Sequence, residues 1–289
     1  MKKDKHLENK NMNDSRKEFS VLLSLYDGEA PNYLDLCLRS IFDQTLAPKE
    51  VVLVIDGPIR QELKSILSYW SDFIPILEVA IDNNVGLAKA LNLGLLKCNY
   101  DLVIRMDTDD ICKKDRFEKQ VDFLQKNTNI DICGSDCDVI SQEGNVYDEL
   151  IVPKEHSSIK RLIWCCPIVH PTVIFRKSSI LRIGGYSETT PRRQDDYELW
   201  IRAASRGLIF SNLPEKLIYY RLAKNLKTKN TFSVAWNRAK IGFVAVKQND
   251  PRLFSYLALC FPMLRAIIPN SLFSALLPWI HKIDPRRRP

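Results

Sequence analysis

Three aspartates follow an apolar, strand-like run near the middle of the sequence. The run D-L-V-I-R-M-D-T-D-D spans residues 101–110 and ends in Asp107, Asp109 and Asp110. Because clustered carboxylates repel one another, folding alone gives no reason to place three of them so close together. Mg²⁺ and Mn²⁺ prefer oxygen ligands, and they commonly hold substrate phosphates at the same time. The pattern therefore favours a site for a divalent metal and a diphosphate.

The same stretch allows other interpretations when it is taken alone. It could be an acidic turn in which Asp110 caps a helix that begins near Cys112. A D-x-D sequence could also hold the nucleophile of a phosphatase-type reaction, or form a small calcium loop. These residues by themselves leave the alternatives open.

A second group of acids lies far along the chain from the first. Residues 191–200 read P-R-R-Q-D-D-Y-E-L-W, and their apolar spacing predicts a helix that continues to about Arg206. Asp195 and Asp196 fall in its first turn, where acids complement the helix dipole and cap the helix. Taken alone, this stretch favours a capping role over a catalytic one.

Alternating strands and helices must position the first acid cluster. Apolar runs predict strands at residues 19–25, 51–55, 76–81 and 102–106, with helices between them at 34–45, 61–70 and 87–96. This order predicts a parallel, Rossmann-like half-sheet, in which ligands bind at the carboxyl ends of the strands. Asp56 follows the second strand and Asp107 the fourth, so both acids should lie at that edge. The sequence has no G-x-G-x-x-G turn, which argues against a dinucleotide cofactor.

The second half of the chain predicts a more mixed arrangement. Strands are expected at residues 130–140, 146–152, 170–175 and 217–222, and helices at 113–127, 155–164, 178–183 and 228–248. Together the two halves predict an α/β fold. Its central sheet is mostly parallel and flanked by helices, and a helical extension follows at the C-terminus.

The bulk composition limits the kinds of protein that this chain can be. At 289 residues, with 45% hydrophobic and 27% charged residues, it fits one soluble α/β domain with a C-terminal appendage. The formal net charge of +7 comes without a basic stripe interleaved with aromatics, so no nucleic-acid partner is expected. The N-terminus M-K-K-D-K-H-L-E-N-K has no apolar core and does not read as a signal peptide, which predicts a cytoplasmic protein.

The eight cysteines have irregular spacings, and several lie in apolar runs, as expected for buried thiols in a reducing compartment. Cys133 and Cys137, or the neighbours Cys165 and Cys166, could be considered as zinc ligands. Their spacing is poor and no histidine is paired with them, so we do not expect a zinc site.

The C-terminal region is apolar but cannot form an uninterrupted membrane span. Residues 253–280 are interrupted by Pro262, Arg265, Pro269 and Pro278. No apolar run therefore reaches the ~20 residues that a bilayer requires. The region could lie in a membrane interface, with the arginines at 286–288 against anionic lipid. A packed helical hairpin is the alternative.

Taken together, four segments resemble a bacterial family 2 glycosyltransferase of the GT-A fold, of the branch that builds exopolysaccharide and O-antigen repeat units. In chain order they read V-L-L-S-L-Y-D-G-E, N-N-V-G-L-A-K-A-L-N-L-G-L, R-M-D-T-D-D and Q-D-D-Y-E-L-W. The resemblance extends from about Phe19 to Leu222. We therefore predict a disordered N-terminal arm of residues 1–17, a GT-A domain of residues 18–225 and a helical, membrane-associating segment of residues 226–289.

The resemblance implies a donor site built from the acids at the strand ends. The residues that it places on the donor nucleotide are Tyr26, Glu29, Asp56 and Asp107. It also implies that Asp109 and Asp107 bind a divalent metal, Mn²⁺ or Mg²⁺, which bridges the donor's diphosphate. The family usually has two acids after the second strand, whereas this chain reads I-D-G-P, so the resemblance leaves the nucleotide base open.

The resemblance also implies the groups that act on the acceptor. Asp196 matches the general base that deprotonates the acceptor hydroxyl, and the neighbouring Asp195 is the alternative. The loop before the base, expected near the sugar and acceptor, comprises Gly184, Gly185 and Tyr186. Some relatives have a metal-binding histidine after the last strand. Here that stretch reads R-L-A-K, so Arg221 or Lys224 is expected to contact the diphosphate instead.

The implied reaction is a single displacement that inverts the anomeric centre. The expected donor is a UDP-sugar. The expected acceptor is a saccharide, lipid-linked and at the inner face of the cytoplasmic membrane, where the C-terminus would contact anionic lipid. A metal-dependent nucleotidyltransferase is one alternative, but it would be expected to have a glycine-rich, basic first loop, and Y-D-G-E is acidic. A catalytically silent nucleotide-binding subunit is another, against which the intact Asp107, Asp109 and Asp196 argue.

Overall fold

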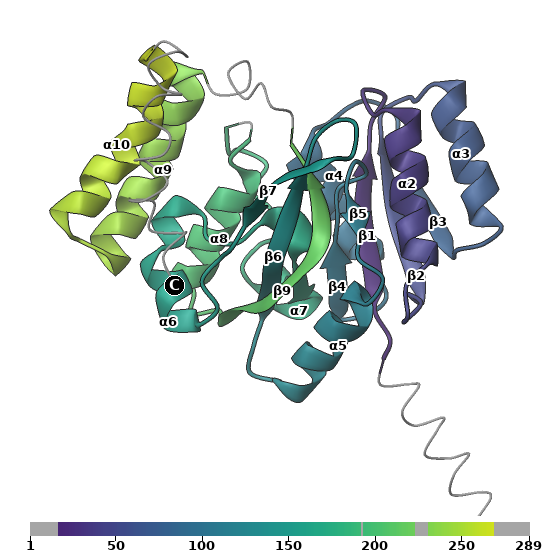
Figure 1. The fold of residues 1–289 in the computed structure, drawn as a ribbon, viewed down its shortest axis with the longest axis horizontal. Helices are drawn as coiled ribbons and strands as arrows, with labels where there is room; N and C mark the ends of the chain where they lie inside the picture. The colour runs from purple at the N-terminus through teal and green to yellow at the C-terminus, as the bar shows by residue number, and fades with distance from the viewer. Residues whose placement is uncertain (1–16, 192, 223–230, 269–289) are drawn as a thin grey trace, which may run out of the picture.

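A mixed sheet of nine strands forms the centre of the computed structural model, which describes residues 17–191, 193–222 and 231–268 (Figure 1). The strands are β1 (Ser20–Leu25), β2 (Glu50–Asp56), β3 (Ile76–Ile81), β4 (Leu102–Arg105), β5 (Ile111–Cys112), β6 (Ile132–Ile140), β7 (Val146–Leu150), β8 (Ile174–Arg176) and β9 (Phe210–Arg221). Their order in the sheet is β3-β2-β1-β4-β8-β6-β9-β5, and β7 pairs with β6. The arm predicted at residues 1–17 lies outside the described residues except for Lys17, as do Lys224 and the arginines at 286–288.

The N-terminal half of the sheet is parallel, as predicted. Strands β3, β2, β1 and β4 all pair in parallel. The connections between them form the helices α2 (Pro31–Phe42), α3 (Gln61–Ser71) and α4 (Leu87–Lys97). The carboxyl ends of parallel strands meet at one edge of a sheet, so Asp56 at the end of β2 and Asp107 just after β4 are brought to the same edge.

The other half of the sheet is mixed. Strand β8 runs antiparallel to β4, and β6 runs antiparallel to β8. Strand β9 is parallel to β6, and the short β5 lies antiparallel on β9. The chain therefore returns to the sheet edge at which β4 ends, which places residues from its second half beside the first acid cluster.

Two element boundaries differ from the prediction near the acids. Residues 111–112 form β5, and helix α5 (Arg116–Lys126) begins only after it, so Asp110 does not cap a helix. The strand expected at 170–175 begins as the 3₁₀ turn η2 (His170–Thr172), and only β8 continues as a strand. Proline at 171 explains this difference, because it has a fixed φ and no N–H for the sheet.

Strand β9 is much longer than the predicted strand at 217–222. Its pairing with β6 skips two residues, since Ser135 lies opposite Leu213 and Asp136 lies opposite Lys216. The two skipped residues include Pro214, which a β-bulge tolerates because no ladder hydrogen bond is required there. The proline therefore kinks the strand instead of ending it.

Two apolar clusters, one on each face, hold the sheet. Side chains alternate between faces along a strand, so Leu22 joins one cluster while Val21 and Leu23 join the other. Helix α4 lies very close to the first face, because a Cβ at Gly94 would meet the side chains of Leu22 and Val54 at 2.5 Å. The glycine therefore allows this helix to pack closely against β1 and β2.

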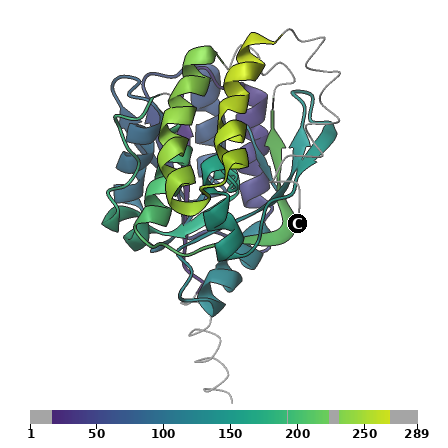
Figure 2. The ribbon, with the colours of Figure 1, turned by 90° about the vertical axis from the view of Figure 1, so that its left-hand side faces the viewer.

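The C-terminal region forms a helical hairpin in the described residues. The remaining helices are α6 (His156–Arg161), the 3₁₀ turn η1 (Ile163–Cys165), α7 (Lys177–Arg182), α8 (Asp195–Ser205), α9 (Phe232–Asn249) and α10 (Leu253–Ile267). Figures 1 and 2 show α9 and α10 side by side at one end of the molecule, next to the part that contains α8. A Cβ at Gly242 of α9 would lie 2.2 Å from the hydroxyl of Tyr197 in α8, so the hairpin docks tightly there. None of the described helices has the length and hydropathy that a membrane crossing requires.

Candidate functional site

The first acid cluster lies in the turn between β4 and β5. Carboxylate oxygens of Asp107, Asp109 and Asp110 all lie within 4.8 Å of one another. The apolar side chains of β4 are buried, so the strand fixes the start of this turn in the sheet. Pairing of β5 with β9 fixes its end. The three carboxylates are therefore held together by the sheet itself.

A buried arginine neutralises part of this charge. Arg105, the last residue of β4, is 1% exposed and donates two hydrogen bonds to Asp107, from Nη1 to Oδ2 at 2.9 Å and from Nη2 to Oδ1 at 2.5 Å. The two residues stand two positions apart at a strand end, where alternate side chains share a face. This pair was not predicted, although an arginine inside an apolar strand is a signal in the sequence that could have indicated it.

The other two carboxylates lack a matching cation. Burial, followed by the charges of Asp107 and Glu29, raises the pKa of Asp109 to about 7. Asp110 is fully buried, and burial with the neighbouring acids raises its pKa too. Its Oδ1 accepts a hydrogen bond from the backbone N–H of Arg221 at 2.7 Å, but its Oδ2 has no partner. A set of oxygen ligands with excess negative charge and an unsatisfied carboxylate oxygen fits a hard divalent cation.

The first loop, after β1, is tied to the acid cluster through Glu29. The buried Glu29 accepts a hydrogen bond from the hydroxyl of Thr108 at 2.6 Å. In the same loop Tyr26 is 52% exposed, and its ring lies directly over Gly28, where a Cβ would come within 2.3 Å of it. The loop thus has an exposed aromatic ring, whereas the Glu29 carboxylate is bonded within the protein. Nucleotide binding by Tyr26 and Glu29 stays a prediction.

Asp56 holds two loops together at the same edge. Its Oδ1 accepts a hydrogen bond from the N–H of Val85 at 2.7 Å, and its Oδ2 accepts one from the N–H of Gly86 at 3.0 Å. The residue is 4% exposed. Asp56 therefore has a structural role in the loop before α4, and its predicted contact with the nucleotide base stays a prediction.

Arg221 is bound to the protein more extensively than the sequence suggested. Its guanidinium donates hydrogen bonds to the backbone carbonyls of Asp109, Ser141 and Gln142 at 2.8–2.9 Å, and it lies 4.0 Å from the ring centroid of Tyr33. The side chain is buried. These contacts hold the turn that carries Asp109 in place, whereas Nη2 of Arg221 has no hydrogen-bond partner among the described residues. The diphosphate contact expected of Arg221 stays a prediction.

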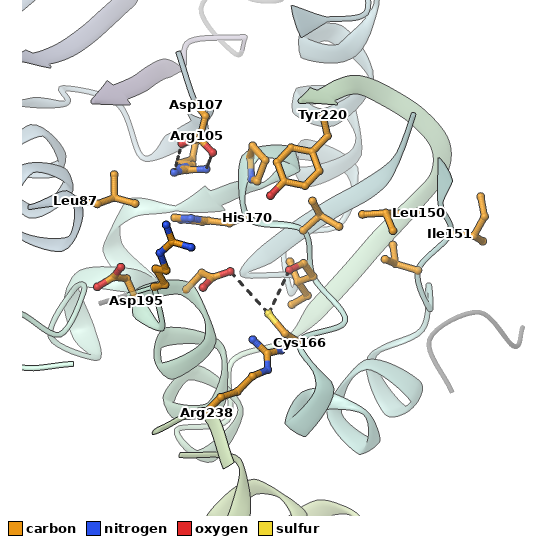
Figure 3. A pocket seen from close by; sticks show the side chains of 16 residues that line it. Leu87, Arg105, Asp107, Leu150, Ile151, Cys166, His170, Asp195, Tyr220 and Arg238 are labelled. Atoms are coloured by element: carbon orange, nitrogen blue, oxygen red, sulfur yellow. Dashed lines mark hydrogen bonds and ion pairs between the residues drawn. The ribbon is translucent and has the colours of Figure 1, made fainter. Parts of the chain in front are cut away.

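Acids from both groups line one pocket of about 340 Å³. Asp107 and Arg105 border it on the side of the first cluster, and Asp195 and Asp196 border it from the first turn of α8. In Figure 3 the Arg105–Asp107 pair lies at one end and Arg238 at the opposite end, with Asp195, His170 and Cys166 between them. Residues that are far apart in the sequence are thus gathered around one space.

The two aspartates of α8 sit in different surroundings within the pocket. Asp196 accepts hydrogen bonds from the backbone N–H of Tyr197 at 2.8 Å and from the Sγ of Cys166 at 3.8 Å. Burial raises the pKa of Asp196, and the charge of Arg238 opposes that rise. Burial and the neighbouring Asp196 also raise the pKa of Asp195. Capping geometry alone does not explain their position, because both carboxylates face the space that Asp107 borders.

The loop of Gly184, Gly185 and Tyr186 supports the pocket from behind. Both glycines have positive φ, and Tyr186 is buried with its hydroxyl 2.9 Å from Nε2 of His170. His170 in turn lines the pocket. Burial, with help from the charge of Arg105, lowers the pKa of His170 well below its usual value, so this ring is neutral. Neither His170 nor Arg238 was predicted from the sequence.

Comparison with known proteins agrees with this architecture. The model of the family "Glycosyl transferase family 2" matches residues 20–183, more than half of the chain. The amylovoran biosynthesis glycosyltransferase AmsE of Erwinia amylovora is 36% identical over 77% of this chain and 82% of its own length. A UDP-Gal:alpha-D-GlcNAc-diphosphoundecaprenol beta-1,3-galactosyltransferase of Escherichia coli is 37% identical over 74% of this chain and 77% of its own.

The fold has a solved counterpart as well. The crystal structure of S. aureus TarS 1-349 in complex with UDP-GlcNAc superposes with a TM-score of 0.63 at 17% identity, covering 92% of this chain and 76% of that one. At this identity the likeness concerns the fold alone, and it confirms the predicted GT-A class.

Proposed function

The chain belongs to glycosyl transferase family 2, and from that premise we propose that it moves a sugar from a UDP-sugar to a lipid-linked saccharide in cell-surface polysaccharide biosynthesis, with inversion at the anomeric carbon. The observation that carries the proposal is the shared pocket, which Asp107 borders on one side and Asp196 on another. The named activities of AmsE and of the Escherichia coli galactosyltransferase support the class of product, the UDP donor and the diphosphate lipid.

The donor end of the pocket is the acid cluster. Asp109 and Asp107 would hold Mn²⁺ or Mg²⁺, with Asp110 close by. When bound, the cation neutralises the charge that builds on the diphosphate as the glycosidic bond breaks. Arg105 keeps Asp107 oriented, Glu29 fixes the turn through Thr108, and the exposed ring of Tyr26 can stack on the base.

The acceptor end is the first turn of α8. Asp196 takes the proton of the attacking hydroxyl, and because burial raises its pKa, its ionised form is a better base than an ordinary aspartate. Attack from the face opposite the leaving diphosphate needs one base and no covalent nucleophile. Asp107 and Asp196, which line one pocket, are placed to meet these requirements.

The donor half of the proposal is tested by thermal stability against UDP, GDP, CDP and dTDP, each with and without Mn²⁺. A ligand that binds only the folded protein raises its unfolding midpoint with occupancy. We expect UDP with Mn²⁺ to raise the midpoint and UDP alone to do so much less. If no nucleotide raises it, the transferase proposal is wrong.

We further propose that the hairpin α9–α10 lies against the cytoplasmic face of the membrane. Trp236, Phe243 and Leu257 expose 47%, 52% and 63% of their surface. Residues 231–268 contain five basic residues and one acid, and that acid, Asp250, is buried and paired with Arg252. Exposed aromatic rings beside lysines are typical of helices in a membrane interface.

The membrane contact predicts that the protein sediments with vesicles that contain phosphatidylglycerol. Replacing Trp236 and Phe243 by serine together should weaken this binding at least about tenfold, because each ring contributes apolar area to the contact. Tyr69→Ser is the matched control, since this ring is 57% exposed but lies on α3, away from the hairpin. Equal vesicle binding by the wild type and the double variant would contradict the contact.

A further inference from the structure

The C-terminal hairpin contributes a cation to the pocket. Arg238 of α9 lines the pocket together with Asp196, although α9 lies well outside the segment that matches the family model. Its guanidinium lies 4.3 Å from the ring centroid of Tyr197, and Nη2 donates a hydrogen bond to the backbone carbonyl of Cys165 at 3.4 Å. Tyr197 follows Asp196 directly in α8. The hairpin therefore places its arginine beside the proposed base.

Within the described residues the charge of Arg238 acts on the nearby Asp196 but is not matched by a direct ion pair. Across the described ranges of the chain, no carboxylate forms an ion pair with this guanidinium, whereas Arg105 in the same pocket is paired with Asp107. An arginine stays charged even where it is partly buried. One long hydrogen bond and a ring contact leave most of its five N–H donors available.

The position of Arg238 assigns its charge to the acceptor. The donor diphosphate belongs to the end of the pocket that holds Asp107, and the acceptor hydroxyl must reach Asp196. Arg238 lies at the opposite end from Asp107 (Figure 3). A neutral saccharide gives no reason for a fixed cation there, but a phosphate group does, because the planar guanidinium binds phosphate oxygens through two parallel hydrogen bonds.

We propose that Arg238 binds the phosphate of a sugar-diphosphate acceptor and so selects acceptors that are linked through phosphate to a lipid. This inference rests on the proposed transfer function and adds the residue that recognises the acceptor. Helix α9 carries Arg238 toward the pocket, and the same helix exposes Trp236 and Lys240 at the surface proposed to meet the membrane. An acceptor held in the membrane by its lipid would thus reach the pocket past this helix.

The test measures binding of two probes by calorimetry, with the donor site saturated by UDP and Mn²⁺. One probe is N-acetylglucosamine joined through a diphosphate to a decyl chain, and the other is the decyl glycoside without phosphate. The wild type should prefer the diphosphate probe. Arg238→Ala should weaken binding of that probe about 10- to 100-fold and leave the glycoside unchanged. Arg238→Lys should fall between the two, because it keeps the charge without the planar fork.

The matched control is Arg206→Ala, which removes an exposed arginine just after α8. It should leave both dissociation constants unchanged. The proposal is overturned if the wild type shows no preference for the phosphate, or if Arg238→Ala weakens both probes equally. The second result would mean that Arg238 acts through Asp196 instead of on the acceptor.

The test of Arg238 can be interpreted separately from the test of the proposed transfer function. Binding of UDP with Mn²⁺ to Arg238→Ala shows that this variant is folded. If UDP does not bind even to the wild type, the transferase proposal fails, and the two probes are then compared with EDTA present, which keeps the diphosphate from a metal at Asp109. A phosphate preference that depends on Arg238 would still support the site.

Discussion

Replacing Asp196 by asparagine is expected to lower kcat about 10²- to 10⁴-fold, the range typical of a lost general base. The amide keeps the shape of the side chain and its hydrogen bond from Tyr197, but it cannot take a proton. Binding of the donor should be unchanged, because Asp196 belongs to the first turn of α8 and not to the turn between β4 and β5 that carries the first acid cluster. The measurement is the rate of acceptor-dependent UDP release, with donor affinity measured alongside.

Asp195→Asn is the matched control for this variant, since it removes the neighbouring carboxylate in the same helical turn. We expect a much smaller loss of kcat for it. The reverse order, with Asp195→Asn inactive and Asp196→Asn active, would assign the base to Asp195. Full activity of both variants would contradict a carboxylate base in α8.

The pH dependence of the wild type follows from the same residue. Burial raises the pKa of Asp196, and Arg238 only partly opposes that rise. The base acts when it is ionised, so kcat is retained above the raised pKa and lost as the pH falls through it. A profile of kcat against pH should therefore decline on its acid side above the ordinary aspartate pKa of about 3.9. A flat profile down to that value would contradict the assignment.

Replacing Asp109 by alanine is expected to abolish the metal-dependent part of donor binding and to lower kcat/KM at least about 100-fold. A bound cation contributes several kcal/mol to stabilising charge on the diphosphate, and each tenfold in rate corresponds to about 1.4 kcal/mol. The readouts are the rise in unfolding midpoint with UDP and Mn²⁺, and the transfer rate. Removing metal from the wild type with EDTA should reproduce both losses.

Asp115→Ala is the control for the loss of an acid from this segment. Asp115 is a surface residue that pairs with Lys119 one helical turn on, outside the acid cluster. Its replacement should leave both readouts unchanged. If Asp109→Ala still responds to Mn²⁺ as the wild type does, the cluster is an acidic turn without a metal.

The parts of the site that lie in one continuous run were open to prediction from the sequence. Asp107 and Asp109 follow an apolar strand, so their position at a sheet edge follows from the order of elements. The parallel half of the sheet was predictable for the same reason, since strand and helix alternate there without interruption.

The parts of the site that depend on distant segments of the chain could not be predicted from the sequence. Arg238 reaches the pocket only because α9 docks on Tyr197 where Gly242 leaves room, and no local pattern encodes that docking. Arg221 stands at the end of a strand that runs through Pro214 by means of a bulge, and a proline ordinarily argues against a strand. Local residue patterns predict individual strands and helices. Which residues become neighbours across the sheet depends on the register in which distant strands pair, and local patterns do not specify that register.

The most direct test of the account is a transfer reaction with a panel of UDP-sugars, Mn²⁺ and the decyl-diphosphate acceptor, followed by nuclear magnetic resonance of the product. We predict that one UDP-sugar is consumed, that UDP is released only when the acceptor is present, and that the new glycosidic bond has the opposite anomeric configuration to the donor. Retention of configuration would contradict the single displacement with Asp196 as base. Absence of acceptor-dependent UDP release from every donor would contradict the proposed transfer itself.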